Sequence, residues 1–244
     1  FPVANPNDFD YRSVAGQIEE KREYALFVAG NAIPDIINAT GRVMGMEDTL
    51  YNLAVGHEAT LDYINRRVHM HLSILERILA EHTGKIDFMW LGEDLGTQIA
   101  PMISLDMFRS IFRPILQRFV DLAKAYKLPV MIHTCGSSSW AYEDFIKIGI
   151  NAVDTLQPEA ANMSPTYLKE HFGNRLSFRG CLSTAGPLSW GSVDEVIADV
   201  KSTLAIMMNG YGYHFATTHS IQDNTPTENV IALYNSVHQY GVYP

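Results

Sequence analysis

The residues best suited to chemistry are an imidazole and a thiol two positions apart, His133 and Cys135, within the run Ile-His-Thr-Cys-Gly. Residues 129–133 form a short apolar run typical of a buried strand, and side chains two apart on a strand point to the same side. Imidazole nitrogen and thiolate sulfur suit Zn²⁺, which in catalytic sites has three protein ligands and one open position. The alternative is a hydrogen-bonded buried histidine beside an inert buried cysteine, because two ligands alone do not make a site.

Two adjacent carboxylates, Glu93 and Asp94, follow a second apolar run, within the segment Trp-Leu-Gly-Glu-Asp-Leu-Gly-Thr-Gln. Carboxylates between glycines can bind a metal, orient a ligand, or serve as acid and base. The alternative is a solvated acidic turn, or an anion placed before a helix. We expect Glu93 and Asp94 to be catalytic, with Trp90 and Gln98 of the same segment as substrate contacts.

Two further residues compete to be the third metal ligand. His219 follows the last apolar run of the chain, and Cys181 follows the run at residues 176–179. For Cys181 the better interpretation is a small buried hydrophobic residue. Ser137, in the turn after Cys135, and Gln157, at the end of another apolar run, are further candidates for substrate contacts.

The elements that must position these side chains are apolar strands alternating with amphipathic helices. Unalternating apolar strands between helices are typical of a parallel sheet covered by helices, in which functional groups gather at the carboxyl ends of the strands. Ser192, with Glu195 three residues on, forms a capping box that predicts a helix start. The predicted strands are residues 24–29, 86–91, 129–133, 152–156, 176–179 and 214–217, and the predicted helices are 61–82, 105–126, 142–148, 193–208 and 227–240, with a short helix in an irregular segment at 31–46.

Composition narrows the function classes. The net charge of −9 over 244 residues argues against nucleic-acid binding, and no apolar stretch reaches the roughly 18 residues of a membrane span. Two cysteines do not make a disulfide framework, and reduced thiols fit a cytoplasmic location. We expect one domain over residues 1–244. A chain that opens with Phe1 and shows six strand–helix units, where a closed barrel has eight, is expected to lack an N-terminal part.

Four motifs, in this order, resemble the uroporphyrinogen decarboxylase-like superfamily. They are Gly-Glu-Asp-Leu-Gly-Thr-Gln at 92–98, His-Thr-Cys-Gly at 133–136, Phe-Arg-Gly-Cys-Leu-Ser-Thr at 178–184, and His-Ser-Ile-Gln-Asp-Asn-Thr-Pro-Thr-Glu-Asn at 219–229. The resemblance runs from about residue 86 to the end of the chain. It implies an α/β fold, a (β/α)8 TIM barrel that is incomplete in this chain, and members with a longer N-terminal part.

The resemblance implies two activities. Decarboxylases of the superfamily use no metal and hold an acidic tetrapyrrole through arginines and an aspartate of the N-terminal part. Cobalamin-dependent methyltransferases bind zinc through a His-x-Cys pair and a later Cys. His133 and Cys135 look like the methyltransferase pair, whereas His219 stands where the thiol-methylating members have Cys and the decarboxylases have His.

We therefore expect a zinc-dependent methyltransferase that moves a methyl group between a small thiol or methyl ether and cobalamin on a corrinoid-binding partner protein. An incomplete barrel exposes sheet edges, so a homodimer is also expected. The alternatives are a metal-free decarboxylase, which scarce basic residues disfavour, and a non-catalytic accessory domain. The expected metal ligands are His133, Cys135 and His219, with Cys181 competing and Glu93 as fourth ligand or acid/base, while Asp94 and Gln98 orient the substrate.

Overall fold

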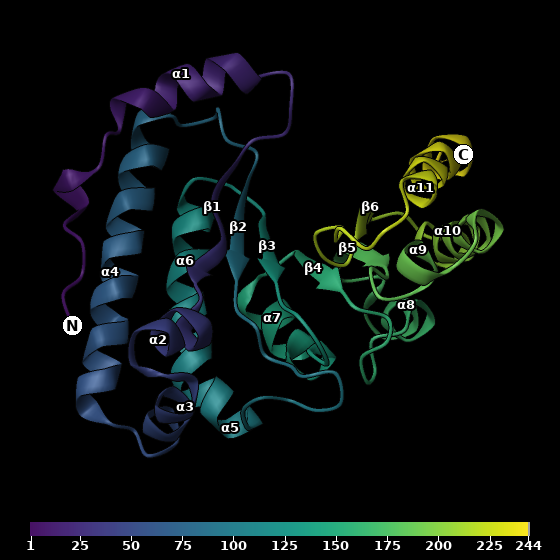
Figure 1. The fold of residues 1–244 in the computed structure, drawn as a ribbon. Coiled ribbons are helices and arrows are strands. Elements are labelled where there is room, and N and C mark those ends of the chain that lie inside the picture. The colour runs from purple at the N-terminus through teal and green to yellow at the C-terminus, as the bar shows by residue number, and fades with distance from the viewer. Residues whose placement is uncertain (244) are drawn as a thin grey trace. The chain divides into compact units, whose positions relative to one another are not determined.

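The computed structural model describes residues 1–243 and contains six parallel strands that alternate with helices (Figure 1). The chain forms two compact units. Unit 1 consists of Phe1–Asp94, Ile103–His133 and Lys147–Ile150, and unit 2 consists of Leu95–Met102, Thr134–Ile146 and the chain from Asn151 onward.

Unit 1 is built on three strands paired in parallel, in the order β1-β2-β3. One face of β2 and β3 is fully buried, through Met89, Leu91 and Ile132, whereas the side chains that alternate with them are partly exposed. The long helix α4 packs on β1 and on α6, and Phe119 and Val120 of α6 are buried. The elements of unit 1 are η1 (Pro6–Asp8), α1 (Arg12–Lys21), β1 (Phe27–Pro34), α2 (Ile36–Met44), α3 (Met46–Ala54), α4 (Glu58–Glu81), β2 (Phe88–Gly92), α5 (Leu105–Met107), η2 (Phe108–Phe112), α6 (Arg113–Ala125) and β3 (Val130–His133).

Unit 2 holds three more parallel strands, in the order β4-β5-β6. Helix α10 packs on β5, α8 and α11, and its capping box between Ser192 and Glu195 is present as predicted. The elements that lie in unit 2, apart from the last residues of α7, are η3 (Ser139–Ala141), α7 (Tyr142–Ile148), β4 (Ala152–Leu156), α8 (Pro165–Phe172), β5 (Ser177–Leu182), α9 (Pro187–Trp190), α10 (Val193–Met207), β6 (Tyr213–Thr217) and α11 (Thr227–Tyr240).

The predicted alternation of strands and helices is confirmed, and the differences lie at the element boundaries. Strand β1 covers Phe27–Pro34 instead of residues 24–29, because the chain bulges after Ala29 and re-pairs with β2 at Pro34. The helix predicted over residues 105–126 contains a π-helical turn, η2, between α5 and α6. Helices α1, α3 and α8 and the short helix α9 were not predicted.

Glycines of two motifs allow backbone segments of unit 2 to touch. Gly136 has a φ of 69°, and a Cβ at this position would collide with the carbonyl group of Gly96. A Cβ on Gly96 would in turn meet the backbone of Ser137 at 2.5 Å. The amide of Ser137 donates to the carbonyl of Thr97 (2.8 Å), so the loop after Gly96 and the turn after Cys135 are joined.

Within residues 1–243, no helix combines the length and the apolar character that crossing a membrane requires.

Candidate metal centre

The strand register of unit 1 brings the carboxylate segment and the histidine to one edge of the sheet. Gly92, the last residue of β2, pairs with His133, the last residue of β3. The amide of Glu93 donates to the carbonyl of His133 (3.0 Å), which continues the ladder by one step. The backbone that follows Gly92 therefore lies beside His133 at the carboxyl ends of the two strands.

Glu93 points back into unit 1 and binds the first turn of α2. Its side chain is 1% exposed, and its carboxylate accepts from the amides of Ile36 (2.6 Å) and Ile37 (3.1 Å). Burial raises the pKa of Glu93 to about 8, although the two amide donors, which favour the carboxylate, act in the opposite direction. Glu93 thus satisfies helix N–H groups that have no partner within α2.

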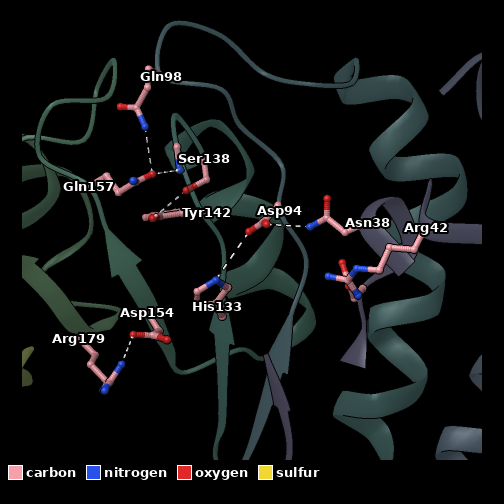
Figure 2. Close-up of polar contacts among 12 residues, drawn as sticks. Asn38, Arg42, Asp94, Gln98, His133, Ser138, Tyr142, Asp154, Gln157 and Arg179 are labelled. Carbon is pink, nitrogen blue, oxygen red and sulfur yellow. Dashed lines mark hydrogen bonds and ion pairs between the residues drawn. The ribbon is translucent and has the colours of Figure 1, made fainter. Parts of the chain in front are cut away.

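Asp94 has the other orientation and faces the imidazole. Its Oδ1 lies 3.7 Å from Nε2 of His133, and its Oδ2 accepts from Nδ2 of Asn38 (2.8 Å). Figure 2 shows Asp94 between these two side chains. The side chains of His133 and Asp94 are 15% and 28% exposed, so both are sheltered but accessible. Of the two adjacent carboxylates, Glu93 therefore binds the start of α2, whereas Asp94 faces His133.

Cys135 follows His133 by two residues, and its side chain is half-buried. One ligand atom from each of Asp94, His133 and Cys135 lies within 4.8 Å of the other two. Ligand atoms at 2.0–2.3 Å from one tetrahedral zinc ion are about 3.3–3.8 Å apart, so small side-chain adjustments would let the three groups share an ion. Oxygen, nitrogen and sulfur donors together fit Zn²⁺, and a fourth position would remain for substrate.

The two other candidate ligands lie elsewhere in unit 2. Cys181 is 2% exposed within β5, and burial raises the pKa of its thiol to about 12, which keeps it protonated at neutral pH. His219 is exposed on the loop after β6. Among the residues that the structure describes, the one group of three ligand side chains close enough to hold a metal contains neither Cys181 nor His219.

Three of the expected substrate contacts belong to one polar network of unit 2. Nε2 of Gln98 donates to Oε1 of Gln157 (3.3 Å), and the same oxygen accepts from the amide of Gly136 (2.7 Å). The hydroxyl of Ser137 donates to the carbonyl of Ala161 (2.9 Å). This network holds the turn that carries Cys135, and Gln98 remains exposed. Trp90, the fourth expected contact, lies in β2 of unit 1 with its ring 5.0 Å from that of Phe27.

Arg179, the one lysine or arginine in the four motifs, forms an ion pair with an aspartate. Nη1 of Arg179 lies 2.6 Å from Oδ1 of Asp154, whose side chain is 1% exposed. The two residues are paired across β4 and β5 (Figure 2). Arg179 is therefore engaged with a buried carboxylate of its own unit.

One residue of the site was not identified from the sequence. Asn38 lies in the segment expected to be irregular, and no motif marks it. The register of α2 against the end of β2 brings its amide to Asp94.

The comparisons with known proteins agree with this fold. Residues 93–240, more than half of the chain, match the family model described as Uroporphyrinogen decarboxylase (URO-D). The structure of a methyltransferase from Methanosarcina mazei is similar, with a TM-score of 0.63 and 18% sequence identity, over 85% of this chain. This chain spans 57% of the length of that protein. A search among curated proteins gave no match.

Proposed function

The chain belongs to the uroporphyrinogen decarboxylase family, and within this family we propose that it is a zinc-dependent methyltransferase. The methyl group would move between a small thiol or methyl ether and the cobalt of a corrinoid carried by a partner protein. The observation that supports this proposal is the donor set of Asp94, His133 and Cys135 at the strand ends. The fold shared with a methyltransferase is consistent with it.

His133 and Cys135 are the proposed zinc ligands, and Asp94 is proposed as a further ligand, whereas Glu93, the expected fourth ligand or acid/base, binds the first turn of α2 instead. A zinc ion held there would act as a Lewis acid, lowering the proton affinity of a substrate thiol or stabilising the oxygen of a departing alkoxide. Glu93 would contribute indirectly, because it fixes α2 beside Asp94. That His219 is a ligand stays a prediction, which a single substitution can decide.

Gln98 and Gln157 are proposed to contact the substrate. The amide of Gln98 is exposed and bonded to Gln157, which in turn holds the amide of Gly136 one residue after Cys135. A substrate that displaced Gln98 from this bond would gain an amide donor and acceptor. Trp90 and Ser137 stay predicted substrate contacts. A homodimer, a cytoplasmic location and a single domain over residues 1–244 also stay predictions.

Metal content tests the proposal. The purified full chain should retain about one zinc per molecule, measured by elemental mass spectrometry, and a variant carrying His133→Ala and Cys135→Ser should retain little. A Cys135→Ser variant with full zinc content would refute the assignment. The zinc-loaded protein should then demethylate a thioether or methyl ether in the presence of reduced cobalamin, followed by the change in corrinoid absorbance.

A metal-free decarboxylase is the second candidate, because the matching family model carries the description of that activity. The ion pair of Arg179 with Asp154 weighs against it, since a substrate with many carboxylates needs basic groups that are available to bind it. Turnover of uroporphyrinogen by zinc-depleted protein, followed by absorbance, would favour the decarboxylase over the methyltransferase. A folded protein with neither zinc nor a ligand-dependent thermal shift would favour an accessory domain.

A further inference from the structure

The start of α2 is joined to the end of β2 residue by residue. The amide of Asp35 donates to the carbonyl of Gly92 (3.0 Å). The next two amides, those of Ile36 and Ile37, donate to the carboxylate of Glu93 (2.6 and 3.1 Å). Successive residues of one segment thus bind successive residues of the other. The first turn of α2 therefore has a fixed register against the residues that lead to Asp94.

The next residue of each segment continues the series. Nδ2 of Asn38 donates to Oδ2 of Asp94 at 2.8 Å, while the other oxygen, Oδ1, faces Nε2 of His133 at 3.7 Å. The close-up in Figure 2 shows this division of the carboxylate. One oxygen is committed to the amide, and the other is directed toward the imidazole.

A second attachment within unit 1 joins α2 to α4. Nη2 of Arg67, on α4, donates to the carbonyl of Pro34 (3.1 Å), and Nη1 donates to the hydroxyl of Thr40 (3.5 Å). These bonds bracket Asn38, which lies between Pro34 and Thr40 in the chain. The amide of Asn38 is therefore carried by a helix that is fixed on both sides of it.

We propose that Asn38 is a positioning residue that sets the orientation of the Asp94 carboxylate for metal binding. The inference rests on the proposed function and concerns how that site achieves its affinity. A partly exposed carboxylate that lacks a fixed partner rotates among several rotamers, and each rotamer that turns Oδ1 away from His133 weakens ion binding. The hydrogen bond to Oδ2 removes that freedom before the ion arrives, and outer hydrogen-bond partners of this kind typically change metal affinity by about 10–100-fold.

The test compares three variants of the full chain. Asn38→Ala removes the amide, and Asn38→Leu removes it while keeping a similar volume. Asn52→Ala, on the neighbouring helix α3, is the matched control, because its amide reaches only the sulfur of Met44 at 3.9 Å. Zinc dissociation constants are measured with the metal alone, by competition with a chromophoric chelator, and thermal unfolding is recorded for each zinc-free protein.

Asn38→Ala and Asn38→Leu should each weaken zinc binding by about 10–100-fold, with the Asn52→Ala variant within twofold of wild type. A role in packing alone would leave the Asn38→Leu variant with normal affinity, which would overturn the proposal. Wild-type affinity in both Asn38 variants would do the same. A wild-type chain that binds no zinc would overturn the proposed function itself, and the positioning role with it.

Discussion

Two pairs of ligand-type residues lie at or near the carboxyl ends of strands in this molecule, and they differ in their surroundings. His133 and Cys135 are half-buried, and a carboxylate oxygen of Asp94 lies 3.7 Å from the imidazole. Cys181 is buried in β5 with its thiol kept protonated, and His219 is exposed on a loop. The residue types are the same in both pairs. Burial and the neighbouring acid therefore distinguish the candidate ligands, whereas position after a strand does not.

The adjacent carboxylates Glu93 and Asp94 also differ in their surroundings. They are adjacent in the chain, yet one closes the first turn of α2 and the other faces His133. Consecutive side chains at a strand end point to opposite sides. Only one of two neighbours is then available to a site on a given side.

The contrast between the two cysteines should be largest in their reactivity. At pH 8 a thiol with a pKa of about 12 is ionised to roughly one part in 10⁴, and the Cys181 side chain is also buried, whereas that of Cys135 is half-buried. In zinc-free native protein, iodoacetamide should therefore modify Cys135 far faster than Cys181. Peptide mass spectrometry over a time course gives both rates, and equal rates would break the comparison.

The second largest difference between Cys135 and Cys181 is expected in the effect of their substitution on zinc affinity. A structural zinc site with four protein ligands is worth about 10–16 kcal/mol, and on that scale the removal of one ligand weakens zinc binding by roughly 100–1000-fold. Cys135→Ser should show this loss, and Cys181→Ala should stay within about threefold of wild type. Chelator competition measures both. A larger loss in the Cys181 variant would make that residue the ligand.

Substitution of the two adjacent carboxylates should separate stability from metal binding. Glu93→Ala leaves two buried amides without acceptors, which should lower the free energy of unfolding by roughly 2–4 kcal/mol. Asp94→Ala should cost less than about 1 kcal/mol, because the side chain is partly exposed, but should weaken zinc binding. Urea unfolding of the zinc-free proteins provides the first comparison. The reverse pattern would exchange the two roles.

The smallest effect is expected at His219. His219 is a predicted ligand whose side chain is exposed on its loop, so His219→Ala should weaken zinc binding less than His133→Ala does. A loss of zinc affinity as large as that of His133→Ala would make His219 a ligand of equal importance, and an unchanged affinity would remove it from the ligand set.

The fold was readable from the sequence wherever a pattern was local. Unalternating apolar runs gave the six strands, and the Ser192–Glu195 box gave the start of α10. Helix α8 had a detectable signal that was not used, since Ser164 caps it and Pro165 opens it. The end of β1 had no such signal, because its bulge and its return to β2 at Pro34 depend on pairing between distant segments.

The site was readable only in part for the same reason. The His-x-Cys spacing identified two residues without any structure, because i and i+2 share one side of a strand. The choice between Glu93 and Asp94 depended on where α2 lies, and the part played by Asn38 depended on its register. Hydrogen bonds between residues more than fifty positions apart leave no spacing to recognise.

The most direct test of the account is the X-ray absorption spectrum of the zinc-loaded protein at the zinc edge. The account predicts one sulfur at about 2.3 Å, from Cys135, and nitrogen or oxygen ligands at about 2.0–2.1 Å. The Cys181→Ala variant should give the same spectrum. Two sulfur ligands, or none, would contradict a centre formed by Asp94, His133 and Cys135.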